Sequence, residues 1–345
     1  MPDEALPIVL PIDENLTAIG EAADAYTAHS IFSDYQGRRA RNTLRRQLDD
    51  LQLFCAFLSG AGVSKSADLL FSEPSAWTGM TAGLVKGFVQ WQVKRGYSIA
   101  SVNSRLATIK TYCKLATDAS VLSALQLARI TLVKGYRHKE GRHLDQERPL
   151  SRVGAKKAQW TTLNAGHAEL LKRQPTTRIG RRDGLMMCLF LDLGLRCGEM
   201  RDLEVRDLDL ATGRLTFYRE KVDKEQIHQL APETLIAAMR YVPDGAGSRY
   251  LFPGQRDRNT GEERTLDERS INDRVRTLGT RIGLLTLSPH DLRHFWATEA
   301  AKHGTDVKSL QEAGGWSSPA MALHYISSSE IANQGIKRGP QPEKG

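Results

Sequence analysis

The stretch from Arg137 to Lys157 is the feature that most restricts what this chain can fold into. The apolar periodicity of the preceding residues fades here, and the stretch is charged and punctuated by glycine and proline. Such a composition is typical of an exposed connection between domains. At 345 residues the chain is long for one domain and comfortable for two. We therefore expect a flexible N-terminus at 1–30, a first domain at 31–136, a basic linker at 137–157, a second domain at 158–330 and a tail at 331–345.

Apolar residues recur at helical spacing in the first domain. One stripe runs from Thr43 to Leu58 and a second from Ser98 to Ala116, where Ser98 or Ser101 can serve as N-cap. Leu84–Val89 suggests a further helix between them. The first domain is therefore expected to be a small helical domain. The stripes consist of Leu44, Leu48, Leu51, Cys55 and Leu58, and of Val102, Leu106, Ile109, Tyr112 and Ala116.

The second domain mixes helices with two short strands. Leu185, Leu189 and Leu193 mark a helix, and Leu215–Tyr218 and Gln226–Leu230 have the residue types of strands with a charged turn between them. Further helices are expected through Ile271–Ile282, from Ser288-Pro289 and from Ser318-Pro319. The predicted fold class is mainly α with a small antiparallel β-sheet, in which a helical N-terminal domain precedes an α+β domain.

Four separated segments of the second domain contain the residues that can perform chemistry. They are Gly194–Met200, Glu220–Lys224, His290–His294 and Gly314–Tyr325. Together they resemble the tyrosine recombinase (phage integrase) family. That family has an Arg-x-x-Glu segment, a lysine on a β-turn, a His-x-x-Arg helix, and a Gly-(His or Trp) segment with the nucleophilic tyrosine nine residues beyond that His or Trp. The resemblance covers residues 159–326 closely, and the first domain resembles the family's core-binding domain more loosely.

The resemblance assigns a role to each matching residue. Arg196 and Arg293 would bind the phosphate oxygens, because a guanidinium is always charged and presents paired donors to a phosphate. Tyr325 would be the nucleophile, and Lys221 the general acid that protonates the departing 5′ oxygen, with Lys224 as the fallback. Glu199 is expected to anchor an arginine or a histidine rather than to react.

Two further positions of this set leave alternatives open. His290 could accept the tyrosine proton or bind a phosphate oxygen. Trp316 stands where histidine is commoner in the family, and its indole can donate a hydrogen bond but cannot shuttle a proton. The next histidine, His294, is expected to be structural and to point away from its neighbours, and His324 to lie on a different helical face from Tyr325.

Charge points to a polyanionic partner. The formal net charge is +8 and the pI about 9.3. One basic stretch, Arg38–Arg46, holds five arginines. A second basic stretch, from Arg129 to Lys157, includes the predicted linker. Such stripes are typical of phosphate contact, although a solvated helix face is the alternative. The candidate DNA-contacting residues are the five arginines of the first stretch, Arg38, Arg39, Arg41, Arg45 and Arg46.

Other features exclude several classes. The four cysteines have no C-x-x-C pair and the histidines no metal spacing, so we expect free thiols and no metal site. The N-terminus is acidic and broken by prolines, unlike a signal peptide, and no apolar run approaches the length of a membrane span. We therefore expect a cytoplasmic protein without a membrane segment.

The family resemblance implies a site-specific recombinase that forms a 3′-phosphotyrosine and passes through a Holliday junction. It implies four protomers on double-stranded DNA with short inverted repeats, and no cofactor, since the phosphotyrosine conserves the energy of the bond. The alternatives are a type IB topoisomerase-like enzyme that relaxes DNA and a catalytically silent DNA-binding relative. The DNA target, the kind of mobile element and any exchange of the tail between protomers are left open.

Overall fold

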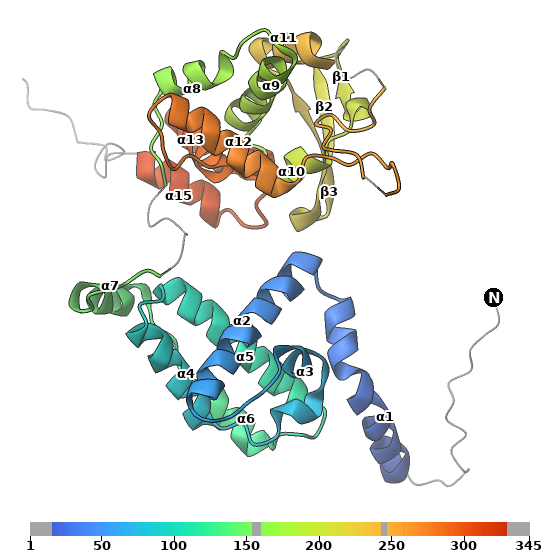
Figure 1. The fold of residues 1–345 in the computed structure, drawn as a ribbon, viewed down its shortest axis with the longest axis vertical. Coiled ribbons are helices and arrows are strands. Elements are labelled where there is room, and N and C mark those ends of the chain that lie inside the picture. Colours follow the sequence, from blue (N-terminus) through green and yellow to red (C-terminus); the bar gives the residue numbers. More distant parts are fainter. Residues whose placement is uncertain (1–15, 154–159, 243–246, 258, 330–345) are drawn as a thin grey trace, which may run out of the picture. The chain divides into compact units, whose positions relative to one another are not determined.

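The computed structural model describes residues 16–153, 160–242, 247–257 and 259–329. The chain divides into two compact units, Met1–Lys156 and Lys157–Gly345, shown in Figure 1. Helices dominate both, and the described strands form one three-stranded antiparallel sheet in the second unit. The predicted fold class, mainly α with a small antiparallel sheet, is confirmed.

The first unit is a helical domain around an aromatic core. Trp77 stacks between Phe54 and Tyr112, and its indole N–H donates to the Leu70 carbonyl at 2.8 Å. Every member of the stripe predicted for Ser98–Ala116 is buried, and Ser98 caps that helix by accepting a hydrogen bond from the Ser101 N–H. The helices are α1 (Leu16–Gly37), α2 (Arg41–Gly60), α3 (Ala67–Ser72), α4 (Ala82–Lys94), α5 (Ile99–Asp118), α6 (Ala124–Thr131) and α7 (His138–Glu147).

Helix α2 buries only part of the face that its leucines predict. Leu51 and Leu58 of the predicted stripe are buried, but Leu44 and Leu48 are only partly covered, and the buried face instead includes Gln47, Asp50 and Phe54. Asp50 can face inward because the Thr108 hydroxyl donates to it at 2.7 Å and Arg46 lies 2.6 Å from it. A buried carboxylate needs such partners, and one of them, Thr108, lies far away in the sequence.

Two predicted irregular segments contain helices. Helix α1 begins at Leu16, so residues 16–30 are helical, unlike the predicted flexible N-terminus. The predicted linker, 137–157, begins with α7, and Arg148 after it donates to the carbonyls of Val93 and Tyr97 at 3.1 and 3.0 Å. These contacts make α7 part of the first unit. Residues 1–15, 154–157 and the tail 331–345 lie outside the described residues.

The second unit surrounds a long buried helix, α9, which packs against α8, α11 and α13 (Figure 1). The sheet has the order β1-β2-β3, and Arg219 pairs with Lys224 at the end of the β2–β3 hairpin. The elements are α8 (Ala165–Lys172), α9 (Arg178–Leu193), α10 (Cys197–Asp202), β1 (Leu208–Asp209), β2 (Arg214–Arg219), β3 (Lys224–Gln229), α11 (Pro232–Tyr241), α12 (Glu268–Arg281), α13 (Pro289–Lys302), α14 (Val307–Gly314) and α15 (Ala320–Ser329).

Helix α13 starts where Ser288-Pro289 predicts. Asp291 accepts from the Ser288 N–H at 2.8 Å, and Pro289 occupies the first turn, where its missing N–H costs nothing. The second Asp291 oxygen accepts from the Thr161 N–H at 2.9 Å, which attaches the segment before α8 to this helix. Among the described residues, no helix is both long enough and apolar enough to span a membrane.

Candidate active site

Three arginines meet at the C-terminal end of α14. Arg196 donates to the Gly315 carbonyl at 2.7 Å, and Arg219 to the carbonyls of Gly314 and Ala313 at 2.7 and 2.8 Å. Arg293 donates to the carbonyls of Gly314 and Gly194. The last carbonyls of a helix lack partners within it and carry partial negative charge, so they attract cations. This arrangement, here called the arginine cluster, is made of Arg196, Arg219 and Arg293.

Glu199 is the acidic member of the site. Its Oε1 accepts from Arg196 Nη1 at 2.7 Å and lies 3.5 Å from Arg219 Nη1, and its Oε2 accepts from the Arg196 N–H at 2.8 Å. The structure thus brings Glu199 into contact with two arginines. One carboxylate offsets part of the repulsion among three cations.

Glycines allow the arginines to approach the main chain. Gly194 and Gly315 have φ of +60° and +56°, which side chains with a Cβ rarely adopt. A Cβ at Gly194 would lie 2.2 Å from the Trp296 ring, and one at Gly315 would lie 2.5 Å from Arg219. The glycines of the two sequence segments are therefore required by packing around the arginine cluster.

Tyr325 lies beside the arginine cluster. It is 3% exposed and packs with Ala297 and Leu310 in a small core formed by α13, α14 and α15. Its ring stacks on Trp316 at 5.6 Å, and the same indole lies 4.9 Å from the Arg293 guanidinium carbon. Trp316 therefore contacts both the tyrosine and the arginine that the sequence analysis selects.

Two histidines of α13 extend from the tyrosine hydroxyl. Tyr325 Oη lies 2.7 Å from Nδ1 of His294, and His294 Nε2 lies 2.9 Å from Nε2 of His290. The expectation that His294 points away as a structural residue is wrong. Residues four apart share a helical face, so the position of His294 relative to His290 was the signal that could have identified it.

Burial determines the protonation of these groups. It lowers the pKa of Arg293 to about 9 and that of Arg219 to about 10, so both stay charged at neutral pH. Burial lowers the pKa of His294 to about 4 and raises the pKa of Tyr325, while the Arg293 charge opposes the latter change. A neutral phenol therefore faces a neutral imidazole at pH 7.

Sequence reasoning missed Arg219, the most deeply buried arginine of the site. Its side chain is completely buried beside the Phe217 ring. The signal was the alternation of β2, since Leu215, Phe217 and Arg219 all face inward at a period of two.

Lys221 and Lys224 lie at the β2–β3 turn, and both are exposed. Lys224 pairs with Arg219 in the hairpin, but in the described part of the chain neither lysine ammonium forms a hydrogen bond or an ion pair. The turn is nevertheless attached to α14, because Arg219 ends β2 and Gln226 donates to the Glu312 carbonyl at 2.8 Å.

The candidate DNA-contacting arginines lie where α1 ends and α2 begins. All five are exposed, but two have partners within the unit. Arg46 donates to Asp50 at 2.6 Å and to Ser104 at 2.9 Å, and Arg39 lies over the Tyr35 ring.

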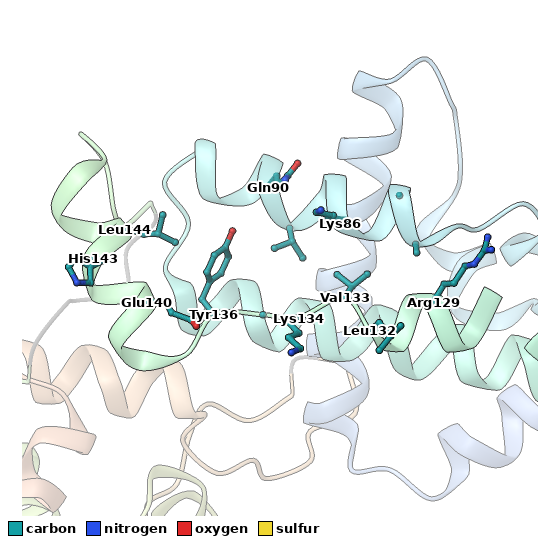
Figure 2. A pocket seen from close by; sticks show the side chains of 14 residues that line it. Lys86, Gln90, Arg129, Leu132, Val133, Lys134, Tyr136, Glu140, His143 and Leu144 are labelled. Atoms are coloured by element: carbon teal, nitrogen blue, oxygen red, sulfur yellow. The ribbon is translucent and has the colours of Figure 1, made fainter. Parts of the chain in front are cut away.

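The second basic stretch contributes to a groove of about 870 Å³ in the same unit. Figure 2 shows Lys86 and Gln90 of α4, Arg129 and Lys134, and Leu144 of α7 lining it. The groove thus combines a basic rim with apolar walls.

The cysteines take no part in the site. All four are free thiols, and burial raises the pKa of Cys113, Cys188 and Cys197 to about 12, so they remain protonated. In the described ranges, no group of three or more histidine, cysteine or acidic side chains is placed to hold a metal ion.

Known proteins resemble this chain in sequence. A family model described as the phage integrase family matches residues 164–331, which include the arginine cluster and Tyr325. A tyrosine recombinase XerC of Xanthomonas campestris pv. campestris (strain B100) is 26% identical over 337 residues, which cover 94% of this chain and 92% of the relative. Residues 164–331 therefore belong to the tyrosine recombinase (phage integrase) family. This recombinase is also 25% identical to a tyrosine recombinase XerA of Pyrococcus furiosus over 234 residues, 67% of this chain and 71% of the relative.

Solved structures resemble the recombinase in fold. A lambda integrase dimer bound to a COC′ core site matches with a TM-score of 0.57 and 12% identity, over 96% of this chain and 85% of that chain. The Tn1549 transposon integrase in complex with transposon right end DNA matches with a TM-score of 0.55 and 14% identity, over 86% and 94%. At these identities the likeness shows the fold alone.

Proposed function

We propose that this recombinase cuts and rejoins DNA at specific sites by transferring a phosphodiester to Tyr325. Attack by the phenolic oxygen forms a 3′-phosphotyrosine and releases a 5′-hydroxyl, which can then attack the phosphotyrosine of a partner strand. The observation that supports this best is the position of Tyr325, stacked on Trp316 beside the buried guanidinium of Arg293. A nucleophile and a fixed cation in one small core are what phosphoryl transfer to a side chain requires.

Arg196 and Arg293 are proposed to bind the non-bridging oxygens of the scissile phosphate. These oxygens gain negative charge in the transition state, so donors fixed before the reaction stabilise it. A guanidinium has five N–H donors, more than the contacts with Glu199 and the main chain use. Glu199 is proposed to hold Arg196 in place and to take no part in the bond changes.

Lys221 is proposed as the general acid for the 5′ oxygen, with Lys224 as the fallback. Its exposed ammonium on a hairpin turn can approach a bound DNA strand without breaking an existing ion pair. The Trp316 indole is proposed to support Tyr325 and Arg293 and to donate to a phosphate oxygen. His290 is proposed either to accept the proton of Tyr325 or to bind a phosphate oxygen.

Double-stranded DNA is the proposed substrate, held partly by the exposed arginines Arg38, Arg39, Arg41 and Arg45, whereas Arg46 is bound to Asp50. We further propose four protomers on short inverted repeats, a Holliday junction intermediate, no cofactor and a cytoplasmic location. The family membership favours recombination over a topoisomerase-like activity, and the complete set of reactive side chains argues against a silent relative.

Trapping the covalent intermediate tests this function. Nicked duplexes made from inverted repeats in the DNA that flanks the gene would lose a short 5′-hydroxyl fragment after cleavage, so the phosphotyrosine accumulates. The wild-type protein should form a 3′-phosphotyrosyl adduct and Tyr325→Phe should form none. Tyr26→Phe, at an exposed tyrosine of α1, is the matched control and should react like the wild type. Adduct formation by Tyr325→Phe would refute the assignment.

A further inference from the structure

We propose that His294 accepts the proton of Tyr325 and passes one on to His290, so that two histidines act in series on the nucleophile. The inference deepens the proposed function and rests on it. His294 is then a catalytic residue, because it touches the reacting oxygen, and His290 acts on Tyr325 only through it.

The distances define a continuous path. Tyr325 Oη, His294 Nδ1, His294 Nε2 and His290 Nε2 follow one another, with contacts of 2.7 Å and 2.9 Å between the residues. Both histidines project from one face of α13, and their rings meet edge to face with centroids 4.3 Å apart. Trp160 stacks on the His294 ring at 5.0 Å, which limits the rotation of the ring away from the hydroxyl.

The transfer balances with no other reactant. The phenol donates its proton to Nδ1 of His294 while the Nε2–H of His294 moves to Nε2 of His290. The products are the Tyr325 phenolate, a neutral His294 and an imidazolium at His290. The phenolate then forms the bond to phosphorus, and the bond from phosphorus to the 5′ oxygen breaks with protonation of that oxygen by the proposed acid, Lys221.

The second histidine favours the transfer because the positive charge then lies on His290 and not on His294. His294 is half-buried and its pKa is lowered to about 4 by burial and by neighbouring charges, so it is a poor place to keep a proton. His290 is exposed, and water can solvate the imidazolium there. The ionisable groups that face His294 are His290, Asp291 and Arg293 of α13, and His324 and Tyr325 of α15.

Substitution by asparagine separates proton transfer from positioning. The amide oxygen of His294→Asn can replace Nδ1 as a hydrogen-bond acceptor, but it cannot take up the proton. Adduct formation on the nicked duplex should slow by about 100- to 10,000-fold, the usual contribution of general base catalysis. A merely positioning role predicts a near-normal rate in this variant. His324→Asn is the matched control, because that ring also packs against Tyr325 but lies outside the path, and it should be unaffected.

A more acidic phenol provides a rescue that a folding defect would not show. Difluorotyrosine introduced at position 325 loses its proton more readily, so it should restore much of the rate lost in His294→Asn. The rate of the unrescued variant should also keep rising with pH as the phenol ionises directly to water. Loss of the rate without rescue, or a wild-type rate in His294→Asn, would overturn the relay.

A measurement without DNA checks the direction of the hydrogen bonds. In protein with ¹⁵N-labelled histidine, the relay requires Nδ1 of His294 to be unprotonated and Nε2 protonated at neutral pH. A protonated Nδ1 would refute the relay and leave the proposed function intact. Conversely, a wild-type protein that forms no adduct on any flanking repeat refutes the proposed function, and the relay with it.

Discussion

Replacing the buried arginine at the end of β2 should weaken the second unit by about 3 kcal/mol. Arg219→Met removes both hydrogen bonds from its guanidinium to α14. The Gly314 carbonyl keeps Arg293 as a donor, but the partly buried Ala313 carbonyl loses its side-chain donor, which costs toward the lower end of about 1–3 kcal/mol. The charge-assisted bond to Gly314 is also lost, at about 1.5–3 kcal/mol. Removal of the buried Nε, which has no partner among the described residues, offsets part of this loss.

Scanning calorimetry of the full chain measures this cost, since the first unit provides an internal reference. For a unit of this size, about 3 kcal/mol corresponds to a fall in Tm of roughly 6–12 °C. Arg219→Lys should fall between the variant and the wild type, because an ammonium keeps the charge without the planar pair of donors. If Arg219→Met lowers the free energy of unfolding by less than about 1 kcal/mol, the inferred anchoring of the hairpin to α14 is wrong.

Three further predictions follow from exposure and charge. Lys221→Ala should keep its stability within about 0.5 kcal/mol but slow adduct formation by about 100-fold or more, and a 5′-bridging sulfur in the DNA should restore the rate, since a thiolate leaves without a proton; no restoration would exclude it as the acid. Arg45→Ala should reduce the slope of log affinity for DNA against log salt by about 0.9 at unchanged Tm, whereas Arg46→Ala should lower the Tm of the first unit because it removes the shorter of the two ion pairs of the buried Asp50; the reverse pattern would contradict the assignment. Burial lowers the pKa of His228 to about 4, so the unfolded chain binds more protons between pH 4 and the ordinary value of 6.5. The stability of the second unit should therefore fall as pH falls through that window, and less so in His228→Gln; equal pH dependence in both proteins would argue against this cause.

Local patterns predicted the parts of the fold that depend on neighbours in the sequence. The stripe through Val102 and Tyr112, the cap at Ser98 and the start of α13 at Ser288 are all present, because each depends on contacts within one or two helical turns. The buried face of α2 was predicted only in part: Leu51 and Leu58 are buried, but the inward position of Asp50 depends on Thr108 of another helix. The spacing of apolar residues within α2 cannot predict a hydrogen-bond partner on another helix.

The candidate site divides in the same way. Order and spacing of the motifs selected Arg196, Arg293 and Tyr325, and the structure brings them to one place. Arg219 was missed because an arginine in a strand is ordinarily solvated, and only the inward alternation of β2 opposes that reading. His294 was predicted to be structural, although it lies four residues after His290 and therefore on the same face of α13 as a residue already assigned to the site.

The end of α14 has a consequence for which mutations the recombinase can tolerate. Its contacts with the three arginines are made by main-chain carbonyls, which every amino acid possesses. No substitution within residues 313–315 can delete an acceptor, so these positions are constrained by space and, at Gly315, by its φ of +56°. At Gly314 an added Cβ would come 2.4 Å from Trp316, and at Gly315 it would meet Arg219. The recombinase should therefore tolerate small side chains at position 313 but no substitution of the two glycines that follow. Saturation mutagenesis of these three codons tests this expectation.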